Sequence, residues 1–257
     1  MLALNTRLNA TADTSPLGSE TAAVVIDILR ASSTIVHALQ AGAKEIIPAL
    51  TVEQAMEWSD HLNSDQCLLA GERHGTLIEG FNLDNSPRSF TKERVLGKSI
   101  IFTTTNGTRA LMMTEMCAGT YIGAFSNLTA LAKHLVTIDV PITLLCAGTD
   151  GNISMEDCLF AGALADTLVK LAPGRYALDD ASTMARRFYQ HQKEEANGVL
   201  ETLKASRGGK NLLELGFSED VLACSRIDLF DIVPHWDATT NTVKLITTGE
   251  AYDGAGI

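Results

Sequence analysis

The sequence predicts an α/β fold with three layers, in which helices cover both faces of a largely parallel or mixed sheet. Short apolar runs alternate with segments of helical periodicity between residues 22 and 171. Strands that are joined through helices pair in parallel, and the helices then cover both faces of the sheet. The chain has 257 residues, of which 46% are hydrophobic, so it can bury a substantial core. No linker or repeat divides it, and we expect residues 1–257 to form one compact domain.

The expected strands are short apolar runs bounded by polar or turn residues. Residues 71–88 are rich in Gly, Asn and Asp, which predicts a long loop, and a loop of this length in a compact domain is often functional. Two late strands are expected at a sheet edge. In order, the expected strands occupy residues 22–29, 45–47, 67–70, 99–104, 121–124, 141–147, 232–234 and 242–247.

The expected helices follow these strands. One at residues 33–41 ends at Gly42, a residue type that commonly terminates helices. Thr51 and Gln54 have the spacing of a capping box, which predicts a helix start and a helix at residues 51–62. Residues 174–225 are expected to be mainly helical. The remaining helices are predicted at residues 107–116, 128–136 and 154–171.

Charge and composition exclude several classes of protein. The net charge of -11 argues against a nucleic-acid-binding protein, which needs a basic face. No apolar run approaches the roughly 18–20 residues that span a bilayer, so we expect no membrane partner. Residues 1–20 lack the apolar core of a signal peptide, and the five cysteines are widely spaced without a CxxC pair. Free thiols of this kind indicate a reducing, cytoplasmic location.

Carboxylates and arginines recur where the expected strands end, which is where open parallel sheets bind ligands. Asp27 lies in an apolar strand, where a carboxylate is costly unless it is paired. It is therefore a Mg²⁺ ligand or general base, which we favour, or the ion-pair partner of Arg30. Hard oxygen ligands favour Mg²⁺ over zinc. The residues expected to hold Mg²⁺ are Asp27, Glu72, Glu156 and Asp157, and those expected to be catalytic are Asp27, Arg30, Glu72 and Arg73.

A polar segment lies where the strand at 99–104 gives way to the helix at 107–116. Free backbone N–H groups and the positive end of the helix dipole suit phosphate at such a junction. The alternative is a helix cap made by Thr105 or Asn106, and the segment alone does not decide between the two. The residues expected to contact substrate are Asn85, Ser86, Thr104, Thr105, Asn106, Gly107, Thr108, Arg109 and Asn127.

Two cysteines raise the alternative of thiol catalysis. Cys67 and Arg73 have the Cys-x5-Arg spacing of thiol phosphatases, and Cys146 lies near a strand end. Both cysteines belong to apolar runs, so we expect their sulfur atoms to pack in the core as small hydrophobic groups.

Five segments together resemble the 2-phosphosulfolactate phosphatase family, in the same order and over roughly residues 22–235. The Gly-Glu-Arg, Asn-Ser-Pro and Thr-Thr-Asn-Gly-Thr-Arg blocks are the specific part of this match. The segments are residues 25–34, 71–73 with 80–87, 103–111, 146–149 and 156–159.

The resemblance implies a Mg²⁺-dependent phosphatase that converts 2-phosphosulfolactate to sulfolactate and phosphate, a step in coenzyme M synthesis. The partner would be a small anionic phosphoester, and a homo-oligomer is compatible with the sequence. His74 and Asp84 stand where the family usually has glycine, and the charge of Asp84 favours a less negatively charged phosphoester. The residues leave open direct attack by water or a phosphoenzyme. They also leave open a phosphatase or lyase for another phosphorylated hydroxy acid, or a non-catalytic anion-binding protein.

Overall fold

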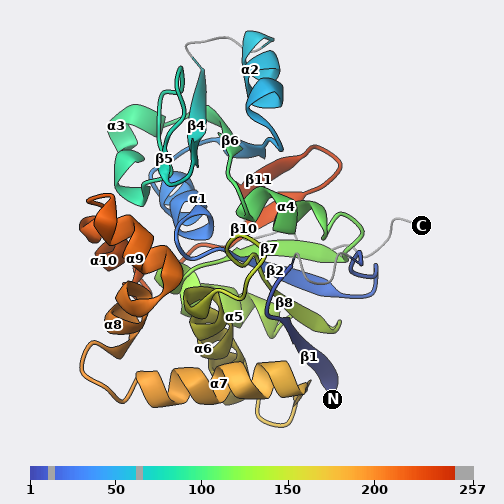
Figure 1. The fold of residues 1–257 in the computed structure, drawn as a ribbon. Helices are drawn as coiled ribbons and strands as arrows, with labels where there is room; N and C mark the ends of the chain where they lie inside the picture. Colours follow the sequence, from blue (N-terminus) through green and yellow to red (C-terminus); the bar gives the residue numbers. More distant parts are fainter. Residues whose placement is uncertain (11–14, 62–65, 247–257) are drawn as a thin grey trace.

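The computed structural model describes residues 1–10, 15–61 and 66–246, and Figure 1 shows their arrangement. The strands are β1 (Leu2–Arg7), β2 (Ala22–Ile26), β3 (Glu45–Pro48), β4 (Cys67–Arg73), β5 (Thr76–Leu77), β6 (Ser99–Thr103), β7 (Gly119–Gly123), β8 (Ile142–Cys146), β9 (Tyr176–Leu178), β10 (Pro234–Asp237) and β11 (Thr242–Leu245).

Ten α-helices occur in the described part of the chain. They are α1 (Ala31–Gln40), α2 (Val52–Asp60), α3 (Lys92–Val95), α4 (Gly107–Met112), α5 (Leu128–Leu135), α6 (Met155–Leu171), α7 (Asp180–Gln192), α8 (Gly198–Ala205), α9 (Arg207–Glu214) and α10 (Ser218–Cys224).

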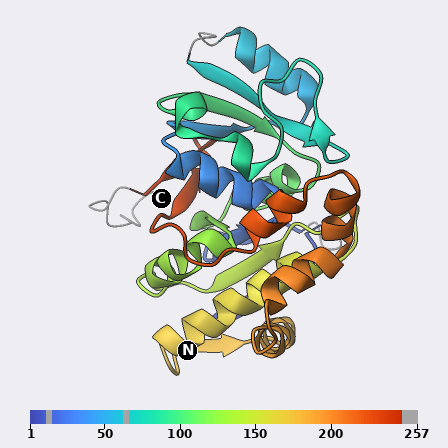
Figure 2. The same cartoon turned by 90° about the vertical axis from the view of Figure 1, so that its left-hand side faces the viewer.

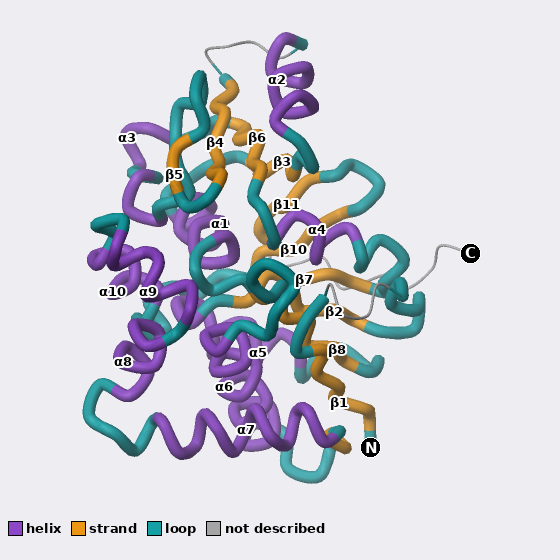
Figure 3. The backbone as a smooth tube through the Cα atoms, in the orientation of Figure 1, coloured by secondary structure: helices purple, strands orange, loops and turns teal. Residues whose placement is uncertain are grey.

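The strands form one mixed sheet in the order β5-β4-β6-β3-β11-β10-β7-β2-β8-β1-β9. Strands β4, β6 and β3 pair in parallel, and so do β7, β2, β8, β1 and β9. The antiparallel hairpin of β10 and β11 joins the two parallel blocks. The carboxyl ends that carry the polar residues therefore come from two blocks rather than from one continuous parallel sheet (Figure 3).

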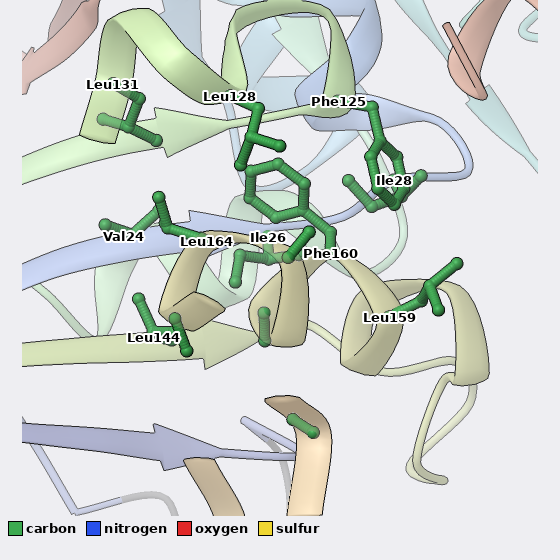
Figure 4. Packing of buried hydrophobic residues seen from close by; sticks show 14 of the residues in the cluster. Val24, Ile26, Ile28, Phe125, Leu128, Leu131, Leu144, Leu159, Phe160 and Leu164 are labelled. Carbon is green, nitrogen blue, oxygen red and sulfur yellow. The ribbon is translucent and has the colours of Figure 1, made fainter. Parts of the chain in front are cut away.

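Helices cover both faces of this sheet, which confirms the predicted three-layer α/β fold. Alternate residues of a strand point to opposite faces, and β2 is buried on both. Val24 and Ile26 pack with α5 and α6, as Figure 4 shows, whereas Ala23 and Val25 pack with α1 and α4. This double burial explains why β2 is apolar throughout.

The C-terminal half of the chain adds helices α7 to α10, of which α7 packs against the middle of α6 (Figure 2). Asp166 of α6, only 1% exposed, accepts hydrogen bonds from Arg186 Nε at 3.1 Å and from Gln190 Nε2 at 2.6 Å. It also pairs with Lys170 and Lys193. Burial raises the pKa of Asp166, but hydrogen bonds from these four side chains outweigh it and hold the pKa well below the usual range. The bonds from Arg186, Gln190 and Lys193 join the α7 segment to α6.

Most of the predicted elements lie where the sequence placed them, but three strands were missed. β1 lies in the polar segment before residue 20, and its two neighbours β8 and β9 supply its hydrogen bonds. β5 extends the β4 hairpin into the segment predicted as loop, and β9 is short. The strand predicted at 232–234 is observed at Pro234–Asp237. The expectation that the two late strands lie at a sheet edge is wrong, because β10 and β11 pair with β7 and β3 in the middle of the sheet. Parts of two predicted elements, residue 62 and residue 247, lie outside the described residues.

Burial also lowers the pKa of one histidine in the fold. His37 lies in the last turn of α1, with its ring edge-on to Phe230 at a centroid distance of 4.9 Å. Burial lowers the pKa of His37 to about 4. The unfolded chain binds a proton near pH 6.5, so stability from this residue is complete above pH 6.5 and falls as the pH drops towards 4.

We therefore predict that acid destabilises the native protein partly through His37. Between pH 7 and pH 4.5, the His37→Gln variant should lose about 2 kcal/mol less of its free energy of unfolding than the native chain. Urea denaturation at both pH values measures this difference, and His61→Gln at an exposed position is the matched control. Equal pH dependence of the native and His37→Gln proteins would contradict the assignment.

Candidate active site

A cavity of about 250 Å³ lies where the segments after β2 and β6, the end of β4 and the first turn of α9 meet. Its wall combines carboxylates, arginines and amides with two apolar side chains. The lining residues are Asp27, Leu29, Arg30, Glu72, His74, Gly75, Asn85, Thr105, Asn106, Thr149, Asp150, Arg207, Gly208, Asn211 and Leu212.

Asp27 follows β2 directly and is 9% exposed at the cavity wall. Burial, the largest cause, and the nearby charges of Glu72 and Glu156 together raise the pKa of Asp27 to about 7, although backbone N–H groups of Ala31 and Gly107 oppose the rise. A Cβ atom on Gly107 would lie 2.7 Å from Asp27 Oδ2, so glycine is required at the start of α4 for this approach.

Glu72, near the end of β4, faces the same cavity and is held by three donors. Its Oε1 accepts from the backbone N–H and the hydroxyl of Thr105, both at 3.0 Å. Its Oε2 accepts from the Gly75 N–H at 2.8 Å. The conformation of this carboxylate is therefore fixed by the segment that follows β6 and by the β4–β5 turn.

The other two predicted metal ligands do not line the cavity. Both carboxylate oxygens of Asp157 accept hydrogen bonds from backbone N–H groups, from Ile28 at 2.9 Å and from Gly148 at 3.1 Å. Burial and the adjacent charges of Glu156 and Asp27 hold the pKa of Asp157 well above its usual range. Asp157 thus joins the ends of β2 and β8 and, unlike Glu72, does not line the cavity.

Glu156 lies between the first turns of α6 and α9. Burial raises its pKa, and the hydroxyls of Ser206 and Ser154 oppose the rise. A Cβ atom on Gly208 would lie 2.4 Å from Glu156 Oε1, so a larger residue at this position would require the carboxylate to move. Its buried Oε2 has no hydrogen-bond partner within the described residues. Those residues contain no group of three or more His, Cys, Asp or Glu side chains already arranged to hold a metal ion.

Arg30 is locked in place by residues distant in the sequence. Its Nη1 pairs with Asp220 Oδ2 at 2.7 Å, and both side chains are 2% exposed. Its Nη2 donates to the Gly75 carbonyl at 2.8 Å, and the guanidinium lies 4.5 Å from the ring centre of Phe217. Ser86 donates to Asp220 Oδ1 at 2.8 Å, so this predicted substrate contact instead supports the ion pair.

Two predicted site residues, Arg109 and Asn127, lie elsewhere. Arg109 is exposed on α4 and does not line the cavity. Asn127 is fully buried, where its Oδ1 accepts from the Ala124 N–H at 2.9 Å and its Nδ2 donates to the Ile122 carbonyl at 3.2 Å. The first points outward because of its register on the short helix, and the second caps the turn after β7.

Three further predicted residues lie beside the cavity. Thr104 and Thr108 share a hydrogen bond of 3.3 Å and line a separate apolar pocket of about 20 Å³. Arg73 donates to the Glu72 carbonyl at 2.7 Å and to Thr103 Oγ1 at 3.0 Å, which fixes the end of β4 against β6. The predicted residues that do meet at the cavity are Asp27, Arg30, Glu72, Asn85, Thr105 and Asn106.

The lining residues of α9 were not predicted. Arg207, Gly208 and Asn211 follow the helix cap Ser206, which accepts from the Gly209 N–H at 2.9 Å. The Ser-Arg-Gly-Gly sequence at residues 206–209 is the available signal, because a capping serine followed by two glycines is typical of a helix start near another group. This sequence does not indicate which part of the sheet the helix approaches.

Comparison with known protein families identifies the chain. The family described as 2-phosphosulpholactate phosphatase matches residues 9–239. The chain belongs to the 2-phosphosulfolactate phosphatase family. This membership confirms the family predicted from the sequence, and it makes the chain an enzyme of the phosphoric monoester hydrolase class.

Several curated bacterial relatives, each named a probable 2-phosphosulfolactate phosphatase, are similar to most of the chain. One from Caldanaerobacter subterraneus subsp. tengcongensis is 43% identical over 82% of this chain and 86% of its own length. One from Thermotoga maritima is 40% identical over 86% of this chain and 90% of its own. One from Clostridium beijerinckii is 37% identical over 83% and 88%, respectively.

The two positions that depart from the family pattern differ in their placement. His74 has a φ of 53° and lines the cavity, so it occupies the left-handed conformation that glycine also adopts. Asp84 accepts from the Ser86 N–H at 3.1 Å and does not line the cavity. Its charge is therefore turned to the local loop rather than to a ligand, contrary to the expectation from the sequence.

The cysteines of the thiol alternative are buried and lie away from the cavity lining. A hydrogen bond with Cys158 and burial hold the pKa of Cys146 well above its usual range, and burial raises the pKa of Cys67. Neither environment favours a thiolate nucleophile. No helix in residues 1–10, 15–61 or 66–246 has the length and apolar character needed to cross a membrane.

We predict that the Arg30–Asp220 pair is essential to the stability of the site. Asp220→Asn should lower the free energy of unfolding by about 3 kcal/mol, because it leaves the guanidinium charge buried without its counter-ion. Glu201→Gln, which breaks the exposed pair with Lys204, should cost less than about 1 kcal/mol and serves as the control. Urea denaturation measures both, and similar losses in the two variants would refute the prediction.

Proposed function

We propose that the chain is a Mg²⁺-dependent phosphatase that hydrolyses 2-phosphosulfolactate to sulfolactate and phosphate, the reaction type of coenzyme M synthesis. The observation that carries the proposal is that Asp27 and Glu72 face one cavity together with Arg30 and Arg207. A phosphatase of this kind has to neutralise and orient a phosphoryl group, and positioned carboxylates and arginines are suited to that task. The free cysteines fit the reducing cytoplasm, where we propose that the protein acts.

The donor set fits Mg²⁺. The ion is usually held by one or two carboxylates together with waters and substrate phosphate, and Asp27 and Glu72 offer two carboxylates on the cavity wall. The raised pKa of Asp27 reflects burial and repulsion from neighbouring carboxylates, which a cation would relieve. Asn85 Oδ1, buried without a partner among the described residues, adds a neutral oxygen at the same wall.

The side chains of the cavity have separate tasks in the proposed reaction. Mg²⁺, when bound, would offset charge on the phosphoryl oxygens. Asp220 and Gly75 occupy two of the five N–H groups of the Arg30 guanidinium, so the others can donate to phosphoryl oxygens at the wall. Asp27, on the cavity wall, would act either as a ligand of Mg²⁺ or as the base that accepts a proton from an attacking water. Glu72, with three donors bound, holds the loop of Thr105 in position.

Phosphate release tests the function directly. Purified protein should release inorganic phosphate from 2-phosphosulfolactate with Mg²⁺ and not with excess chelator. A lyase would consume the phosphoester without releasing phosphate in equal amount, and a binding protein would leave it intact. Either of these outcomes would refute the proposal.

We predict that Asp27→Asn separates activity from stability. It should reduce phosphate release by about 100-fold or more, because it removes a metal ligand or base while conserving size. The variant should be at least as stable as the native chain without metal, since the neutral form of residue 27 suits this buried position. The rise in Tm that Mg²⁺ produces should disappear in Asp27→Asn and persist in the control Glu57→Gln, at an exposed site on α2. Turnover close to native would exclude both roles.

A further inference from the structure

Two arginines line the cavity, and the aspartates that pair with them differ in how deeply they are buried. Arg30 is paired with the buried Asp220 and is itself buried. Arg207 pairs with Asp150 at 2.8 Å, with 61% of its side chain and 58% of that of Asp150 exposed. Both partners of this second pair also line the cavity. The fixed pair is therefore in the interior and the exposed pair at the cavity mouth.

The exposed pair is easily exchanged. Solvent-exposed ion pairs contribute little to stability, so an anion that enters the cavity can replace Asp150 as the partner of Arg207 at little cost. The guanidinium plane fits a carboxylate or another oxyanion through two parallel hydrogen bonds. Arg207 is thus available to a ligand, whereas the side chain of Arg30 is held by Asp220.

Both partners of the exposed pair stand on well-fixed backbone. Asp150 lies in a turn closed by two hydrogen bonds of 3.0 Å between the backbones of Thr149 and Asn152, and its φ is 49°. Arg207 is the first residue of α9, directly after its cap Ser206. Exchange of partners therefore requires a change of side-chain rotamers and no rearrangement of the chain.

The cavity thereby has two ends of different chemistry. Asp27 and Glu72, at 9% and 8% exposure, form an inner wall suited to Mg²⁺ and the phosphoryl group. Arg207 and Asp150 lie at the outer end. A phosphoester with its phosphoryl group inside would present the rest of its carbon skeleton to Arg207.

We propose that Arg207 determines substrate specificity by binding a second anionic group, a carboxylate or sulfonate, on the carbon skeleton of the phosphoester. Asp150 is the counter-ion that holds Arg207 in the ligand-free protein and is displaced by this group. The proposal rests on the proposed phosphatase function for its reaction, but the binding step can be measured without turnover.

The test compares two substrates and three variants. Phospholactate carries a carboxylate beside its phosphate, whereas phenyl phosphate carries none. For Arg207→Gln, the ratio of kcat/KM for phospholactate to that for phenyl phosphate should fall by on the order of tenfold or more, mainly through KM for phospholactate. Lys210→Gln removes one positive charge from an exposed position on the same helix, outside the cavity lining, and should retain the native ratio.

The Asp150→Asn variant should shift the ratio of kcat/KM values in the opposite direction. Asparagine tolerates the left-handed conformation at this position, and the substitution removes the charge that competes for Arg207. The ratio should therefore rise, with a lower KM for phospholactate. An ion pair with a merely structural role would make both Arg207→Gln and Asp150→Asn change the ratio in the same direction or not at all, and either result would overturn the proposal.

Calorimetric titration of phospholactate and phenyl phosphate into the native and Arg207→Gln proteins separates the two proposals. If no phosphate is released from any substrate, the phosphatase function fails, while a selective loss of phospholactate binding in Arg207→Gln still supports the binding role of Arg207. If phosphate is released but phospholactate binds equally to both proteins, the function stands and the role of Arg207 is refuted.

Discussion

The buried ion pair between Arg30 and Asp220 is the constraint on which the geometry of the site depends. Arg30 belongs to the turn after β2, and Asp220 comes from α10, 190 residues later. The same pair takes a hydrogen bond from Ser86 and gives one to the carbonyl of Gly75. A buried charge is costly unless it is paired and hydrogen-bonded. The segments that carry Arg30, Gly75, Ser86 and Asp220 therefore have to pack together for this ion pair to be stable. The cavity is the space that this junction leaves between the sheet and α9.

Folding brings four carboxylates close together, and they differ in the hydrogen bonds that they accept. Asp157 accepts two N–H groups at the ends of β2 and β8, and Glu72 accepts three donors from two loops. Asp27, Glu156 and Asp157 all have raised pKa values, and burial is the largest cause for each. Through the hydrogen bonds that they accept, Glu72 and Asp157 hold loops and strand ends in place, and Asp27 lies at the cavity wall.

The predictable part of the site is the part encoded close to strand ends. Asp27 and Glu72 were predicted because apolar runs locate β2 and β4 and because ligands bind beyond strand ends. Arg109 was placed at the cavity by its motif, but its register on α4 turns it outward. Arg207 was missed because periodicity identifies helices without indicating which part of the sheet they approach. β1 was missed for a similar reason, since hydrogen bonds to β8 and β9, rather than local sequence, make it a strand.

The two arginines show how one cavity can hold one guanidinium rigidly and use another to distinguish between ligands. A guanidinium held by a buried partner cannot move, so it can position a group that every substrate shares, at the inner wall next to Asp27. A guanidinium held by an exposed partner is neutralised until an anion replaces that partner, so its contribution depends on what the ligand carries. A ligand without a second anion leaves the Arg207–Asp150 pair intact and gains nothing from it. Selection thus follows from the difference in burial between two otherwise equivalent ion pairs, whose shortest separations are 2.7 and 2.8 Å.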